Sequence, residues 1–202
     1  MRKHQQNPVV VEWLRLRHTF DDAANRHTAW FSRAGLDSCH DWLRGLDAPG
    51  IVFCGSVEFG QWLAREAKLA YYGPEGQTSS GGSIVHAPEG RSFVASWRAN
   101  KKGLNLQAWP RLLIVMPPQS AKWLEQIVGR AHRQNQFSHV IVDILATSGG
   151  SLDLLKKAFQ EADFARTMII LTQKVLRAEI IRATPTVTPA NEFRWARAKR
   201  DN

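Results

Sequence analysis

Short apolar runs alternate with stretches of helical periodicity through the middle of the chain. The runs that predict strands are residues 51–54, 69–72, 92–96, 111–116 and 139–145. Between the first two runs, Phe59, Trp62 and Leu63 recur at helical spacing. Apolar strands that alternate with helices are typical of parallel sheets with both faces covered. The pattern therefore predicts an α/β fold with a mostly parallel sheet of about five or six strands.

The flanking segments carry a different pattern. From Val9 to Leu46 the apolar spacing predicts helices, and two further helices are predicted at 151–163 and 165–182. The last residues repeat Thr and Pro and then become basic, which is typical of a loosely held tail. The predicted division is an N-terminal helical lead-in at 1–47, an α/β core at 48–148, C-terminal helices at 149–183 and a flexible basic tail at 184–202.

Composition narrows the class of partner. The formal net charge is +9 and the isoelectric point is about 10.1, which favours a polyanion such as DNA or RNA. No apolar run approaches the length of a membrane span, so no membrane partner is expected. The two cysteines, Cys39 and Cys54, lack metal-ligand spacing, no metal site is predicted, and the chain opens without an apolar leader. We therefore expect a cytoplasmic protein.

The most unusual segment is Gln126-Ile-Val-Gly-Arg-Ala-His-Arg-Gln-Asn-Gln136. On a helix, Gln126, Arg130 and Arg133 would share one face, with the apolar residues rotated away from it. This arrangement predicts a face of fixed positive charge on a helix anchored in the core. A solvated basic face with no ligand is the alternative interpretation.

A second segment, Ser96-Trp-Arg-Ala-Asn-Lys-Lys-Gly-Leu-Asn-Leu-Gln107, precedes it. Together the two segments resemble motifs V and VI of superfamily-2 helicases, most closely Swi/Snf-type translocases and related phage helicases. Motif VI of that family reads like Gln-x-x-Gly/Asp-Arg-x-His-Arg-x-Gly-Gln. The matching positions here are Gln126, Gly129, Arg130, His132, Arg133 and Gln136. The resemblance covers about residues 48–148.

The sequence departs from the family pattern in both motifs. Asn100 and Lys101 stand where motif V usually has paired glycines, and Asn135 replaces a glycine of motif VI. Asn tolerates positive φ better than most residues, so the turns can survive at the Asn positions. Lys101 predicts either a different loop shape or a stronger hold on phosphate.

The resemblance implies a RecA-like domain, the second of two in a motor that binds ATP and Mg²⁺ between them. It implies arginine fingers at Arg133 and, second, Arg130, with Gln126 in the same catalytic network and Gly103 and Asn105 facing the nucleotide. An arginine suits this role because its guanidinium stays charged and can stabilise the transferring phosphoryl group. Contacts to the nucleic-acid backbone are expected from Ser56, Ser96, Arg98, Lys101, Lys102 and His132. For Ser56, simple capping of the following helix is an equally good interpretation.

Two motifs of a complete motor are missing from the sequence. It contains neither Gly-x-x-x-x-Gly-Lys-Ser/Thr nor an Asp-Glu pair after an apolar strand. ATP and Mg²⁺ are therefore expected only at an interface with a separate N-terminal helicase half, and this polypeptide alone should bind neither and hydrolyse no ATP. The alternative is a non-catalytic protein of the same fold that binds nucleic acid or imitates a helicase to regulate it.

Overall fold

A five-stranded parallel sheet forms the centre of the computed structural model, which describes residues 13–17, 28–99, 104–133, 139–146 and 149–169. The strand order is β4-β5-β3-β6-β7, and each neighbouring pair is parallel. The strands are β3 (Gly50–Cys54), β4 (Tyr71–Tyr72), β5 (Phe93–Ser96), β6 (Arg111–Val115) and β7 (Ile141–Leu145). The prediction of a parallel α/β sheet is confirmed, with each strand at the expected place in the sequence.

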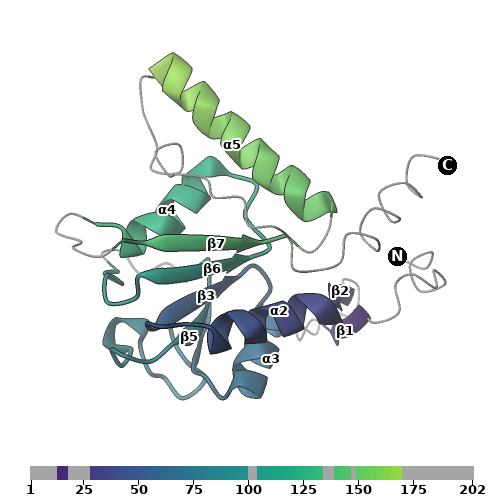
Figure 1. The fold of residues 1–202 in the computed structure, drawn as a ribbon, viewed down its shortest axis with the longest axis vertical. Helices are drawn as coiled ribbons and strands as arrows, with labels where there is room; N and C mark the ends of the chain where they lie inside the picture. Colours follow the sequence, from purple (N-terminus) through teal and green to yellow (C-terminus); the bar gives the residue numbers. More distant parts are fainter. Residues whose placement is uncertain (1–12, 18–27, 100–103, 134–138, 147–148, 170–202) are drawn as a thin grey trace.

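Helices cover both faces of this sheet (Figure 1). One face packs against α2 (Arg33–Arg44) and α3 (Val57–Ala67), and the other against α4 (Ala121–Ala131) and α5 (Gly149–Ile169). Side chains alternate along a strand, so central β3 sends Val52 to the α2–α3 side and Phe53 to the α4–α5 side. Both side chains are fully buried, as expected for a central parallel strand.

The N-terminal segment contains strands as well as a helix. Strands β1 (Trp13–Arg17) and β2 (Thr28–Ser32) pair antiparallel, and contacts join them to α3 and α2 respectively. The helical prediction for 9–46 is therefore wrong for these two segments and correct for α2. From Leu14 to Arg17 the sequence Leu-Arg-Leu-Arg alternates apolar and basic residues, a period of two that favours a strand. Residues 1–12 and 18–27 lie outside the described part.

Among the described residues, a single helix spans the point at 163–165 where a break between two helices was predicted. Helix α5 continues without a break through residues 163–165 to Ile169. Within it, Thr167 Oγ1 donates to the carbonyl oxygen of Asp163 at 3.0 Å, and Arg166 pairs with the Asp163 carboxylate. No Gly or Pro interrupts this stretch, so the chain has no reason to leave the helix. Predictions for 170–202 lie outside the described residues, and no described helix has the length and apolarity needed to cross a membrane.

The start of α4 is capped by a residue from α5. Ser120 occupies the N-cap position but makes no side-chain capping bond. Instead, Glu161 accepts a hydrogen bond from the backbone N–H of Ala121 at 2.9 Å and a longer one, 3.5 Å, from Ser120 Oγ. A carboxylate at a helix N-terminus satisfies a free amide and complements the helix dipole. Glu161 thereby fixes the position of α4 relative to α5.

We predict that Glu161→Ala lowers the free energy of unfolding by about 1 kcal/mol, because it removes this cap. The matched control is Asp153→Ala on the same helix, which removes only an exposed pair with Lys156. That control should change stability by at most about 0.5 kcal/mol. Urea denaturation followed by circular dichroism measures both, and equal effects of the two substitutions would contradict the capping role.

Both cysteines lie in the core between the sheet and the α2–α3 layer. Cys39 and Cys54 are free thiols with no exposed surface. Burial raises the pKa of Cys39 to about 12 and raises that of Cys54 well above its usual value. A thiolate is the reactive form, so both thiols should be inert in the folded protein near neutral pH.

We predict that neither thiol reacts with a thiol-exchange reagent at pH 8 on the timescale on which the urea-unfolded chain reacts completely. The raised pKa values also determine how the free energy of unfolding changes with pH. Because the folded pKa lies above the unfolded one, stability is intact below pH 9 and falls as the pH rises from 9 towards 12. Rapid labelling of the native protein at pH 8 would show that these thiols are reached without unfolding.

Candidate functional site

The carboxyl ends of β3 and β5 bring two candidate segments side by side. Cys54 and Ser96 are register partners, and the backbone N–H of Trp97 donates to the carbonyl oxygen of Cys54 at 3.1 Å. The loop that starts α3 and the loop that follows β5 therefore leave the sheet at the same edge. In open α/β sheets, this is the edge where ligands bind.

The end of α4 meets the loop after β5 at this edge. Arg130 donates through Nη1 to the carbonyl oxygen of Trp97 at 3.4 Å, and Arg133 donates through Nη2 to that of Leu104 at 2.7 Å. The backbone N–H of Leu106 donates to the carbonyl oxygen of Arg130 at 2.9 Å. The two segments that resemble motifs V and VI are thus in direct contact.

The prediction that Gln126, Arg130 and Arg133 share one polar helix face is wrong. Helix α4 ends at Ala131 and His132 is its C-cap, so Arg133 lies beyond the helix. Gln126 is exposed, whereas Arg130 is buried on the side that faces the sheet. The apolar stripe of α4 was placed correctly, but Arg130 belongs to its edge and not to the opposite face.

Arg130 is an unusual buried cation. Its side chain is only 6% exposed, and its guanidinium carbon lies 5.8 Å from the centre of the Phe53 ring. Burial lowers the pKa of Arg130 from its usual value, and the guanidinium makes no ion pair with any described carboxylate. Desolvating a charge without an opposite charge is costly, so the fold presents a cation that an anion would stabilise.

Two candidate serines have their hydroxyl groups engaged locally. Ser56 Oγ accepts from the backbone N–H of Phe59 at 3.2 Å and donates to Glu58 Oε2 at 2.9 Å, so the capping interpretation describes what is observed. Ser96 is 1% exposed, and its Oγ accepts from the backbone N–H of Arg98 at 3.2 Å. Both side chains organise their loops, and the phosphate contacts predicted for them remain predictions.

The other predicted site residues include four that lie at the surface. Arg98, Asn105, His132 and Arg133 are exposed, and Asn105 Oδ1 accepts from the backbone N–H of Gln107 at 3.3 Å. Lys101, Lys102 and Gly103 lie outside the described residues. The four described side chains therefore reach the surface of the protein beside the loop after β5.

A pair of tryptophans next to this site was not predicted from the sequence. The rings of Trp97 and Trp123 meet edge to face with centroids 5.5 Å apart, and the Arg98 guanidinium lies 5.1 Å from the centre of the Trp97 ring. The Trp97 indole N–H is buried without a hydrogen-bond partner among the described residues. A β-carbon on Gly55 would lie 2.7 Å from that nitrogen, so Gly55 is needed to admit the ring. The sequence feature that could have indicated this contact is the aromatic residue directly after Ser96.

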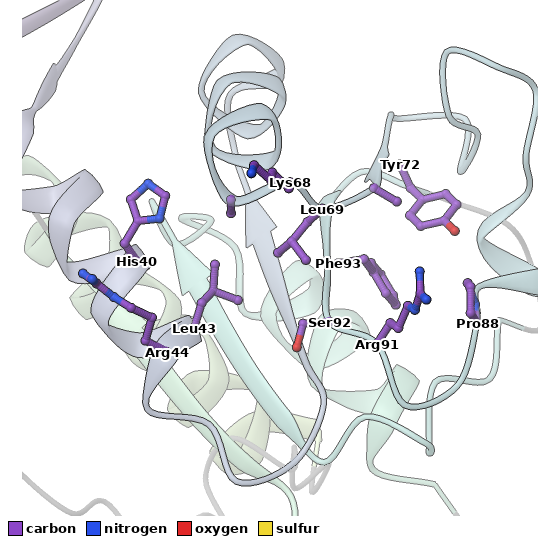
Figure 2. Close-up of a pocket in the computed structure, with 12 residues that line it drawn as sticks. His40, Leu43, Arg44, Lys68, Leu69, Tyr72, Pro88, Arg91, Ser92 and Phe93 are labelled. Atoms are coloured by element: carbon purple, nitrogen blue, oxygen red, sulfur yellow. The ribbon is translucent and has the colours of Figure 1, made fainter.

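A pocket lies away from the motif segments. It has a volume of about 460 Å³, and its lining includes Lys68, Leu69, Ser92 and Phe93 (Figure 2). These residues precede β4 or begin β5, so the pocket opens at the amino edge of the sheet. No group of three or more His, Cys, Asp or Glu side chains suited to a metal occurs in the described residues.

Comparison with solved structures identifies the fold. The C-terminal part of the Fun30 ATPase domain matches with a TM-score of 0.50 at 15% identity. The fold is RecA-like. The match covers 61% of this chain and 45% of the Fun30 chain, so the aligned part spans less than half the length of that structure. No protein-family description matches the sequence, and no curated protein does. The similarity supports a helicase-like RecA fold and no specific activity.

We predict that Arg130→Met leaves the free energy of unfolding unchanged or raises it by about 1 kcal/mol, because it removes a desolvated charge that lacks an ionic partner. The control is Leu124→Ala on the same helix, a fully buried side chain whose truncation should cost about 2–5 kcal/mol. Denaturant unfolding measures both. A loss above about 2 kcal/mol for Arg130→Met would assign the arginine a structural role.

Proposed function

We propose that this chain is the C-terminal motor half of a superfamily-2 helicase or translocase. In this proposal it binds a nucleic-acid backbone and supplies Arg133 and Arg130 to ATP that a separate N-terminal RecA-like domain holds with Mg²⁺. The observation that carries the proposal is the contact of α4 with the loop after β5, through Arg130 and Arg133, at the carboxyl edge of a parallel sheet.

The two arginines suit two different tasks. Arg133 is exposed and bonded to a backbone carbonyl, so it can be released towards a phosphate at modest cost. Arg130 is buried, so its charge would act on the same phosphate through a medium of low dielectric. Guanidinium groups held in this way stabilise the charge that develops during phosphoryl transfer.

A nucleic-acid contact beside these arginines is supported by Arg98 and the two tryptophans. Arg98 is exposed above the Trp97 ring, and the net charge of the chain is +9. A guanidinium next to aromatic rings is suited to a phosphate and to an adjacent base. In the proposed motor, this cluster binds the tracked strand next to the nucleotide.

The second candidate function is a non-catalytic nucleic-acid-binding or regulatory protein of the same fold. The observation that favours it is the absence from the sequence of a phosphate-binding loop and of an acidic pair after a strand. Both functions require nucleic-acid binding, and only the motor half requires ATP hydrolysis with a partner.

We predict that Arg98→Gln weakens binding to a single-stranded oligonucleotide and reduces the slope of log affinity against log salt by about one unit. Lys157→Gln, which removes an exposed charge on α5, is the matched control and should leave the slope unchanged. Fluorescence anisotropy between low and moderate salt measures both slopes. Equal slopes for all three proteins would remove Arg98 from the interface.

We predict that the chain alone hydrolyses no ATP, and that nucleic-acid-stimulated hydrolysis occurs when an N-terminal helicase half with a phosphate-binding loop is added. Arg133→Ala should lower that rate by about 10³-fold or more, because it removes transition-state charge stabilisation. The measurement is phosphate release with and without the partner, with Lys157→Gln as the control. Nucleic-acid binding without hydrolysis in any combination would favour the regulatory function.

A further inference from the structure

We propose that the pocket at the amino edge of the sheet binds a nucleoside phosphate. This site is separate from the ATP contact proposed for the carboxyl edge. Its volume of about 460 Å³ lies within the usual range for small-ligand sites, roughly 300–1,000 Å³. Figure 2 shows the lining side chains gathered from α2, from the end of α3 and from the loop that leads into β5.

The charge of the lining points to an anion. Arg44, Lys68 and Arg91 are part of it, and His40 adds an imidazole ring. None of the twelve lining residues carries a carboxylate. Three permanent or near-permanent cations favour a ligand with more than one negative charge, such as a phosphate monoester, over a single carboxylate.

The local ion pairs leave this charge largely available. Arg44 pairs with Asp41 at 2.7 Å and His40 with Glu66 at 3.5 Å, but neither carboxylate lines the pocket. The Arg44–Asp41 pair is exposed, and pairs of this kind contribute little and exchange readily. Lys68 and Arg91 make no ion pair with a described residue.

Helix capping explains only part of the cluster. Arg44 lies in the last turn of α2, and Lys68 is the C-cap of α3 with a left-handed φ of 56°. Cations in these positions complement helix dipoles without any ligand. Arg91 belongs to neither helix and is exposed in the loop before β5. It is a third cation in the same lining, and no helix end accounts for it, whereas an anion site would.

The floor of the pocket is suited to a ligand with an apolar body. Leu43, Leu69 and Pro88 line it with partly or largely exposed apolar side chains, and the rings of Tyr72 and Phe93, which also line it, are almost completely buried. In Figure 2, Arg44 and Arg91 lie on opposite sides of Leu43 and Leu69, so charge borders an apolar centre. A bare phosphate would leave the apolar lining exposed to water, whereas a sugar and base attached to the phosphate would cover it. The chemistry shared by a free nucleotide and the 5′-terminal nucleotide of a strand therefore fits best.

The experiment is isothermal titration of the full chain with AMP, with adenosine and inorganic phosphate as separate probes. AMP should bind at least about tenfold more tightly than either probe, because only AMP engages both the cations and the apolar floor. Binding of phosphate with the same affinity as AMP would show an unspecific anion site and overturn the proposal.

Charge-removing variants locate the site. Lys68→Asn removes the cation while Asn tolerates the left-handed backbone, and Arg91→Gln removes the other unpaired cation. The double variant should weaken AMP binding by about tenfold or more, with only the small fall in thermal midpoint that follows from losing the cation at the end of α3. Lys157→Gln on α5 is the control and should bind AMP normally. If the double variant loses thermal stability and keeps its AMP affinity, these cations are helix caps only and the proposal fails.

Two further outcomes separate this site from the proposed motor function. Loss of AMP binding in Arg133→Ala, with the double variant unaffected, would place the nucleotide at the carboxyl edge and overturn the pocket proposal. Displacement of AMP by a 5′-phosphorylated oligonucleotide, and not by its 5′-hydroxyl form, would identify a strand end as the source of the ligand. Displacement by neither would identify the free nucleotide. Equal displacement by both forms would show that internal backbone phosphates suffice, against the proposal.

Discussion

Parallel pairing of β3 with both β5 and β6 is the constraint on which the rest of the molecule depends. Because every strand of the five-stranded sheet runs in the same direction, the chain must return across a face after each strand, and each loop that follows a strand emerges at one edge. The buried residues of β3 link the two layers of helices. The loop after β5 and the end of α4 meet because of this topology, although about thirty residues separate their contact partners in sequence.

The sequence was sufficient for the central sheet because its strands are almost wholly apolar and are bounded by Gly, Pro or Ser. Apolar runs of this length between turn residues are typical of strands in parallel sheets, and the central strands β3, β5 and β6 are almost wholly buried. The N-terminal hairpin was missed because its apolar residues also fit helical spacing over a longer window. The local alternation in Trp13–Arg17 favours a strand, and pairing with Thr28–Ser32 decides between the two patterns.

The sequence predicted that the two segments resembling motifs V and VI lie together, as they do, and the roles of their side chains stay predictions. From the motif resemblance, Arg130 and Arg133 were expected next to the loop after Ser96, and their hydrogen bonds to backbone carbonyls of that loop agree with this expectation. The resemblance could not show that Arg130 is buried, because that depends on where α4 ends and on how closely it approaches Phe53. Nor could it show the contact of Trp97 with Trp123, since spacing along the chain does not determine which aromatic rings meet.

Helix α4 is held at both ends by groups from other parts of the chain. Glu161 of α5 binds its first amide, and Arg130 and Arg133 bind backbone carbonyls at the other end. An eleven-residue helix is roughly 16 Å long and stiff over that length. Any rigid shift of α5 against the sheet would therefore displace α4 as well, and with it the end of α4 that contacts the loop after β5. Arg130, in the last turn of α4, would move with the helix even though no ligand touched it.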